Sequence, residues 1–261
     1  MPYIYWLVVI SAAFVVLERL FPWRREQRLL RAGWLRDLGF LVFNGHVFSL
    51  WTAGAAAWLA LGARQGLLLL GWTFDSSPLR SLGFAGQLAV YLLATDLLQW
   101  GIHNLLHRVP FLWEIHKVHH AITTMDWIGS FRFHWMEIVV YRTLQWLPLV
   151  WLGAPDGVVL VVAVIGTAWG HFNHSNLGIG LGPAGYVFNN PRMHLWHHDA
   201  SSEGGTAKNF AVMLSLWDWL FGTAYWPRDR SPRRLGYPGI EEMPAGLAGE
   251  LLFPLTRKRS G

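Results

Sequence analysis

The sequence predicts an all-helical integral membrane protein, with about four or five transmembrane or re-entrant helices and a cytosolic helical cap that holds a histidine-rich site for two metal ions. Three observations lead to this prediction. The chain is 53% hydrophobic and only 14% charged, whereas soluble domains carry about 25% charged residues. Several apolar runs are long enough to cross a bilayer. Eight of its twelve histidines lie in three clusters, at 103–107, 116–120 and 194–198.

The first predicted span covers residues 3–21, which are almost continuously apolar. No positively charged region precedes it and no small-residue cleavage site follows, so we expect an anchoring span rather than a removed signal peptide. The next loop is rich in arginine: Arg24, Arg25, Arg28, Arg31 and Arg36. The positive-inside rule places this loop on the cytoplasmic side, although a solvated run of charge has the same composition.

Two further spans are expected at 38–62 and at about 82–105, and the second returns the chain to the cytoplasm where the histidines begin. Residues 136–152 and 157–173 form shorter apolar runs around a turn at 154–157. These runs predict a helical hairpin or a re-entrant pair. Either arrangement brings the histidines that end the second run to the same side as the earlier ones.

Asp96 lies seven residues before His103, two helical turns along the same face. It is expected either to orient a liganding imidazole or to hydrogen-bond to a neighbouring helix. From residue 175 onward, glycine, proline, asparagine and charge predict a cytoplasmic cap, which ends in a basic tail at 257–259. We therefore divide the chain into N-terminal helices with a basic loop (1–80), a catalytic domain (81–225) and a basic cytoplasmic tail (226–261).

The spacing of the histidines points to metal binding. His103 and His107 are four residues apart and share one face of a helix, and the pattern HxxHH occurs twice, at 116–120 and at 194–198. Imidazole is the commonest side-chain metal ligand, and eight imidazoles are too many for one ion, so two ions are implied. The chain has no cysteine, which excludes disulfides, thiolate sites and iron–sulfur clusters.

A site built from neutral imidazoles leaves the positive charge of its ions uncancelled. If the metal is iron, such a site can bind and reduce dioxygen, and at the membrane surface it can reach a lipid chain that enters from the bilayer. The pattern therefore favours oxidation of a lipid C–H bond. The net charge of +5 lacks the aromatic-interleaved groove of nucleic-acid binders, so we expect a membrane and no nucleic acid as partner.

The motifs resemble those of the fatty acid hydroxylase/sterol desaturase superfamily of membrane di-iron oxygenases. The resemblance covers about residues 90–225 and rests on HNLLH at 103–107, HKVHH at 116–120, HFNHSN at 171–176, HLWHH at 194–198 and WDWLFGT at 217–223. It implies eight catalytic metal ligands: His103, His107, His116, His119, His120, His194, His197 and His198. His171 and His174 complete the implied ligand set. Arg132, His134 and Glu137 match a further family pattern, in which we expect His134 to be structural or close to the substrate.

The resemblance also implies the reaction. Two iron ions activate dioxygen, and a sterol, fatty acyl or related lipid is hydroxylated or desaturated. Electrons must come from an external donor of ferredoxin or cytochrome type with its reductase, because the chain has no cysteine cluster, haem module or dinucleotide motif. Arg108, Lys117 and Arg192 are expected to help this donor dock. We expect the enzyme in a bacterial inner membrane, with the metal site facing the cytoplasm.

Two other functions remain open at this point. A zinc-dependent membrane hydrolase also suits imidazole ligands, and zinc can substitute for iron, but the chain has no HExxH motif. A metal transporter or haem electron carrier would place its histidines at the middle of the spans, whereas these cluster at the predicted ends.

Overall fold

The computed structural model describes residues 1–71, 78–146, 152–179, 181–201 and 208–256. Within these ranges the regular structure is helical, and the extended contacts are two isolated bridges, Pro22 with Leu177 and Asp199 with Leu235. The predicted all-helical class is therefore confirmed. The predicted basic tail at 257–259 lies outside the described residues.

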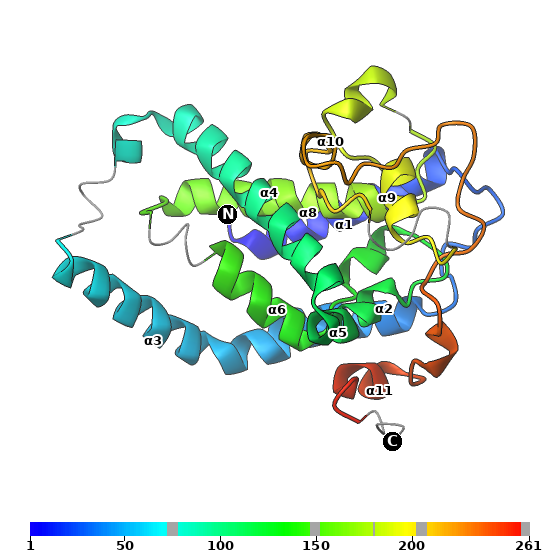
Figure 1. Cartoon of the computed structure of the whole chain (residues 1–261), viewed down its shortest axis with the longest axis horizontal. Coiled ribbons are helices and arrows are strands. Elements are labelled where there is room, and N and C mark those ends of the chain that lie inside the picture. Colours follow the sequence, from blue (N-terminus) through cyan, green and yellow to red (C-terminus); the bar gives the residue numbers. More distant parts are fainter. Residues whose placement is uncertain (72–77, 147–151, 180, 202–207, 257–261) are drawn as a thin grey trace.

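Helices α1 (Tyr3–Leu20) and α8 (Asp156–His174) pack along each other (Figure 1). By length and composition, these two described helices are long and apolar enough to cross a bilayer. One face of α1 exposes valine side chains, including Val8 at 61% and Val9 at 58%. Such a face suits lipid better than water.

The other predicted spans have longer or more broken counterparts. The segment at 38–62 falls in a continuous helical run: α2 (Trp34–Val42), the π-helix η1 (Phe43–Val47) and α3 (Phe48–Leu69). The segment at 82–105 becomes α4 (Phe84–Arg108), which crosses the molecule diagonally in Figure 1. The number of membrane spans, including whether α1 and α8 cross, stays a prediction.

The first arm of the predicted hairpin is short where it is described. Helix α6 (Trp135–Tyr141) continues into the π-helix η5 (Arg142–Trp146), and both pack against α4. The rest of that arm, 147–151, lies outside the described residues. The described part is shorter than the roughly 20 residues that a crossing needs.

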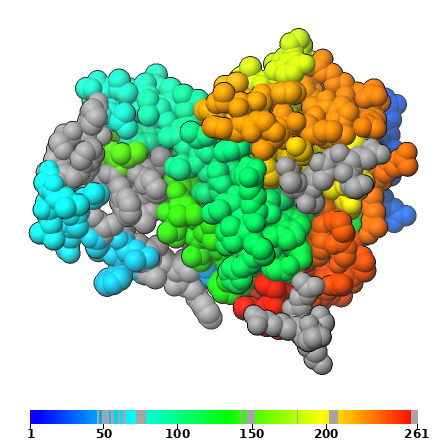
Figure 2. Space-filling model, in the orientation of Figure 1, coloured from blue at the N-terminus to red at the C-terminus, as the bar shows by residue number. Residues whose placement is uncertain are grey.

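Short helices and turns make up much of the rest of the described chain. They include α5 (Pro110–His120), α9 (Pro191–His197), α10 (Leu216–Leu220) and α11 (Leu247–Leu252), together with the 3₁₀ turns η3 (Pro78–Ser81), η4 (Trp127–Phe131), η6 (Gly182–Tyr186) and η7 (Ile240–Glu242). In Figure 2, α4 and α5 fill the centre of the visible face, beside the orange and red C-terminal segments.

A buried network of ion pairs joins the N- and C-terminal segments to this region. Arg31 contacts Asp37 and Asp126 at 2.5 and 2.8 Å, and Arg132 contacts Asp37 and Glu250 at 3.0 and 2.6 Å. Arg36 also pairs with Glu250, at 2.6 Å.

The network changes the interpretation of the arginine-rich loop. Two of its five arginines, Arg31 and Arg36, bind carboxylates. These two arginines therefore hold the network together, and all five still count toward the positive-inside rule, which depends on Lys and Arg rather than on net charge.

Candidate metal centre

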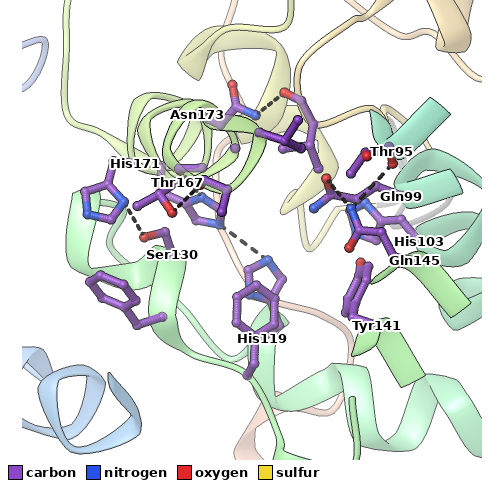
Figure 3. Close-up of a pocket in the computed structure, with 18 of the residues that line it drawn as sticks. Thr95, Gln99, His103, His119, Ser130, Tyr141, Gln145, Thr167, His171 and Asn173 are labelled. Atoms are coloured by element: carbon purple, nitrogen blue, oxygen red, sulfur yellow. Dashed lines mark hydrogen bonds between the residues drawn. The ribbon is translucent and has the colours of Figure 1, made fainter. Parts of the chain in front are cut away.

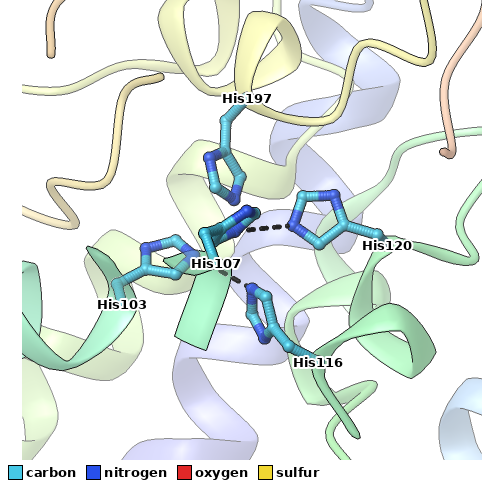
Figure 4. Close-up of side chains that lie close together, drawn as sticks. All are labelled: His103, His107, His116, His120 and His197. Carbon is cyan, nitrogen blue, oxygen red and sulfur yellow. Dashed lines mark hydrogen bonds between the residues drawn. The ribbon is translucent and has the colours of Figure 1, made fainter. Parts of the chain in front are cut away.

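Nine of the ten predicted ligand histidines converge in two adjoining groups, and within each group the nearest ring nitrogens all lie within 4.8 Å of one another. The first group, drawn in Figure 4, contains His103, His107, His116, His120 and His197. The second group contains His119, His174, His194 and His198. All of these side chains are buried except that of His107, which is partly exposed. The prediction of two ion sites thus has a counterpart in the geometry.

Helix geometry explains how each HxxHH motif serves both groups. On α5, the first and last histidines are four residues apart and share a face that points to the first group, whereas His119 points to the second. On α9 the split is reversed: His194 and His198 join the second group and His197 joins the first. Each motif therefore bridges the two groups.

Local sequence sets where these helices begin. Val109 is extended and Pro110 occupies the first turn of α5, so the chain leaves α4 and turns back at this point. Asn190 caps α9, because its side chain accepts a hydrogen bond from the Met193 N–H. Pro191 follows in the first turn of α9.

In the second group, backbone carbonyls fix which ring nitrogen carries hydrogen. The Nδ1 atoms of His119 and His174 lie 3.1 and 2.8 Å from the carbonyl oxygens of Arg132 and Gly170. A carbonyl only accepts, so both Nδ1 atoms must donate, and both Nε2 atoms of the neutral rings present lone pairs. These two Nε2 atoms face each other at 3.3 Å. Facing lone pairs repel each other unless a cation lies between them, so this arrangement fits a metal ion.

The first group shows the same arrangement. The Nδ1 of His103 donates to the carbonyl of Phe210 at 2.7 Å, and the Nδ1 of His116 lies 2.9 Å from a carboxylate oxygen of Glu137. Their Nε2 atoms then face each other at 3.2 Å. The Nε2 of His197 is buried without a hydrogen-bond partner among the described residues. The ring nitrogens of the first group and their hydrogen-bond partners thus fit a metal site held by neutral imidazoles.

Burial keeps these imidazoles neutral. Six histidines of the two groups lie outside α4 and α8: His116, His119, His120, His194, His197 and His198. Removal from water lowers the pKa of each of these side chains, and the neighbouring imidazoles lower it further. A histidine must be deprotonated to bind a metal. The site is therefore prepared for metal binding below the pH at which free imidazole protonates.

The WDWLFGT segment anchors the loop that orients His103. The Asp218 carboxylate accepts hydrogen bonds from the backbone N–H groups of Phe210 and Ala211 at 2.9 and 3.0 Å. The carbonyl of the same Phe210 binds the His103 ring. Asp218 is thus linked to His103, in the first group of histidines, through one peptide unit.

Asp96 takes the second of its two predicted roles. Its carboxylate accepts hydrogen bonds from the N–H groups of Met213 and Leu214, both at 2.9 Å, and from the indole of Trp217 at 2.8 Å. It binds a neighbouring segment and contacts no imidazole through these bonds.

His171 differs from the other predicted ligands. Its Nε2 lies 3.1 Å from the Ser11 hydroxyl and its Nδ1 lies 3.1 Å from the Ser130 hydroxyl. Both ring nitrogens have partners, and the residue lies outside both groups. His134 also lies outside them, because its Nε2 bonds to the carbonyl of Leu251 at 2.9 Å.

A cavity of about 850 Å³ opens directly onto both groups of histidines. His103 and His116 of the first group and His119, His174 and His194 of the second group line it. Figure 3 shows His171 and Ser130 on one side of this cavity and Thr95, Gln99, Gln145 and Tyr141 on the other. These last four residues are not among the predicted site residues. A signal was available, because Thr95, Gln99 and His103 follow one another at four-residue spacing.

Comparison with known proteins gives the family. The model of the family described as fatty acid hydroxylase matches residues 88–223, which is more than half of the chain and includes both histidine groups. The chain belongs to the fatty acid hydroxylase family. The match confirms the resemblance predicted over about residues 90–225.

Several curated relatives of this family member are similar over part of their length. An ornithine lipid hydroxylase of Rhizobium tropici is 31% identical over 175 residues, which is 67% of this chain and 52% of the relative. A very-long-chain aldehyde decarbonylase of Oryza sativa is 29% identical over 56% of this chain and 49% of the relative. An alkylglycerol monooxygenase of Danio rerio is 28% identical over 50% of this chain and 29% of the relative. The chain thus spans about half or less of these relatives' lengths. No solved structure matches it significantly.

Proposed function

We propose that this protein is a membrane-embedded oxygenase that uses dioxygen and external electrons to hydroxylate or desaturate a C–H bond in a lipid. The observation that carries the proposal is the cavity, because one space, with Phe131, Phe133 and Val162 in its wall, touches five histidines from both groups. Its size lies within the range of about 300–1,000 Å³ that is common for ligand sites. The relatives named as lipid hydroxylase and alkylglycerol monooxygenase agree with this proposal.

The two groups of histidines are proposed to hold two iron ions, with His103, His107, His116, His120 and His197 around one and His119, His174, His194 and His198 around the other. Iron at such a centre supplies the activation of dioxygen. Imidazole also suits zinc, so zinc is a substitute that purification can introduce.

The chain's own residues prepare this centre. The carbonyls of Phe210 and Arg132 hold the Nδ1 protons of His103 and His119, and the Glu137 carboxylate binds the Nδ1 of His116. Each of these bonds keeps an Nε2 lone pair directed into its group. The cavity holds the lipid chain against the two groups and keeps water away from them.

The position in the membrane follows from the same proposal. Helices α1 and α8 are proposed to cross the bilayer, and α3, α4 and the segment around 136–152 to complete four or five spanning or re-entrant segments. The metal centre is proposed to face the cytoplasm of a bacterial inner membrane, in a catalytic domain at 81–225 between the N-terminal helices and the C-terminal tail.

The electron donor is proposed to be a ferredoxin or a cytochrome with its reductase. Of the three basic residues expected at its docking surface, Arg108 is exposed. Lys117 pairs with Glu114, and Arg192 lies over the Trp23 ring. Arg108 is thus the most accessible of the three.

Metal analysis tests the proposed iron sites, and the mass of the product tests the proposed reaction. The protein is expressed with ample iron, purified without oxygen, and compared with His197→Ala and with His171→Ala as the control outside both groups. We expect about two irons per chain in the wild type and in the control, and a loss in His197→Ala. With a reductase, a donor and a lipid mixture, the product should gain one oxygen atom or lose two hydrogens.

Other results would contradict the proposal. Zinc that persists after expression with ample iron, with no oxygen consumed in the presence of reductant and lipid, would favour a hydrolase. A product shortened by one carbon would instead match the chemistry named for the Oryza relative.

A further inference from the structure

Polar side chains form a stripe on the cavity wall that leads to the first group of histidines. Thr95 and Gln99 lie on α4 at successive four-residue steps before His103, so all three share one face of the helix. Gln145 of η5 packs across this face, with its amide Nε2 3.3 Å from the Gln99 amide oxygen and 3.4 Å from the Thr95 carbonyl (Figure 3).

The stripe retains hydrogen-bonding capacity. Among the described residues, the Thr95 hydroxyl is buried without a hydrogen-bond partner, and Thr95 is only 6% exposed. The bonds of the two glutamines leave the Gln99 amide nitrogen to donate and the Gln145 amide oxygen to accept. Unpaired polar groups are costly in apolar surroundings, so a ligand that pairs with them is favoured.

The chemistry of the wall limits what this ligand is. Among the described residues, those that line the cavity include no aspartate, glutamate, lysine or arginine, so outside the histidine groups the wall has no charged side chain to neutralise a phosphate or a carboxylate. The stripe offers a hydroxyl, an amide donor and an amide acceptor, all neutral. A group that both donates and accepts a hydrogen bond matches this set, namely a hydroxyl or a secondary amide.

We propose that Thr95, Gln99 and Gln145 bind a hydroxyl or secondary amide within the lipid substrate and thereby set which carbon lies at the metal centre. The inference rests on the proposed function and adds the class of substrate. At 1.5 Å per residue, Gln99 and Thr95 lie about 6 and 12 Å along the helix axis from His103. A polar group held there fixes the register of the lipid chain within one or two helical turns of the site of oxidation.

The competing role for the same residues is structural, because paired amides also join helices in membranes. The test therefore separates binding from stability. Three probes of equal chain length are compared: a long-chain secondary alcohol, a long-chain N-alkyl amide and the corresponding alkane. Dissociation constants are measured by equilibrium dialysis with iron-loaded protein in detergent micelles, and the position of oxidation is mapped by mass spectrometry.

The variants are Gln99→Leu, Gln145→Leu and the nearly isosteric Thr95→Val. The control is Gln87→Leu, because Gln87 lies on the same helix but bonds to the Leu82 carbonyl outside the cavity. We expect the wild type and the control to bind the alcohol or the amide about tenfold more tightly than the alkane, roughly the effect of one hydrogen bond. The three variants should lose this preference, keep their alkane affinity and oxidise several carbons instead of one.

Equal affinity of the wild type for all three probes would overturn the inference, and this result does not depend on any variant folding. Variants that lose thermal stability yet keep the binding preference would assign the stripe to helix packing and would also overturn it. Oxidation of the alkane without any preference leaves the proposed function intact. Binding preference without oxidation of any probe would overturn the proposed function; the three residues would still bind the polar group, but their part in selecting the oxidised carbon would fall with the function.

Discussion

Asp218→Asn is predicted to weaken both the fold and the first group of histidines. The Asp218 carboxylate is fully buried and accepts four hydrogen bonds, at 2.7–3.1 Å, from the Phe210 and Ala211 backbone, the Trp100 indole and the Thr223 hydroxyl. Three of these bonds reach Oδ1, and only the Ala211 N–H reaches Oδ2. The favoured amide rotamer therefore keeps its oxygen at Oδ1 and places its NH₂ group against the Ala211 N–H.

The magnitude follows from this geometry. The substitution removes one hydrogen bond to a charged acceptor, worth about 1.5–3 kcal/mol, and turns three charge-assisted bonds into weaker neutral ones. We expect the free energy of unfolding to fall by about 2–4 kcal/mol. The loosened Phe210 carbonyl no longer holds the His103 ring firmly, so iron affinity should fall by roughly 10- to 100-fold, as for other outer partners of metal ligands.

Thermal unfolding and chelator competition for iron measure the two effects. Asp229→Asn is the matched control, because Asp229 is exposed in the same part of the chain. An Asp218→Asn protein with the unfolding temperature and iron affinity of the wild type would refute the reasoning. It would show that the WDWLFGT segment does not hold the His103 loop through this carboxylate.

Three further predictions concern the Glu137 contact, the Arg132 ion pairs and the pH dependence of stability. Glu137→Leu removes the partner of the His116 Nδ1 and should lower iron affinity by about 10- to 100-fold; Glu137→Gln, which keeps an acceptor oxygen, should recover part of it, and equal losses in both variants would contradict an orienting role. Arg132→Met leaves the carboxylates of Asp37 and Glu250 without their shared partner and should cost about 3–5 kcal/mol of unfolding free energy; a change under about 1 kcal/mol in chemical denaturation would argue against the network. The metal-free protein should lose stability as the pH falls below about 6.5. Its buried imidazoles have lowered pKa values, so the folded protein binds fewer protons than the unfolded chain below about pH 6.5. The free energy of unfolding should therefore fall by about 1.4 kcal/mol per pH unit for each such imidazole as the pH drops. An unfolding temperature that is constant between about pH 7.5 and 5.5 would refute this.

The sequence by itself determined the helical class, the presence of a histidine centre and the family of the chain. Helical periodicity is local, so four-residue spacing places His103 and His107 on one face whatever the rest of the chain does. The same spacing made the two HxxHH motifs recognisable. Their number indicated two ions before any contact was known.

Tertiary structure decided which histidines belong together. His171 and His174 are three residues apart on α8 and are equally plausible ligands by spacing, yet only His174 joins a group. The difference comes from Ser11 and Ser130, which occupy both ring nitrogens of His171 from distant segments. The division of each HxxHH motif between two groups likewise depends on how α5 and α9 face each other.

The outer partners of the centre were equally inaccessible to sequence reasoning. The atoms that orient His103 and His197 are carbonyls of Phe210 and Lys208, and every residue type carries a carbonyl, so no side-chain pattern marks them. Gln145 meets Gln99 only because η5 packs on α4. The residue types and their spacing along each helix identified the histidines. The packing of helices far apart in the chain decided how these histidines are grouped, which ring nitrogen carries hydrogen, and which residues form the cavity wall.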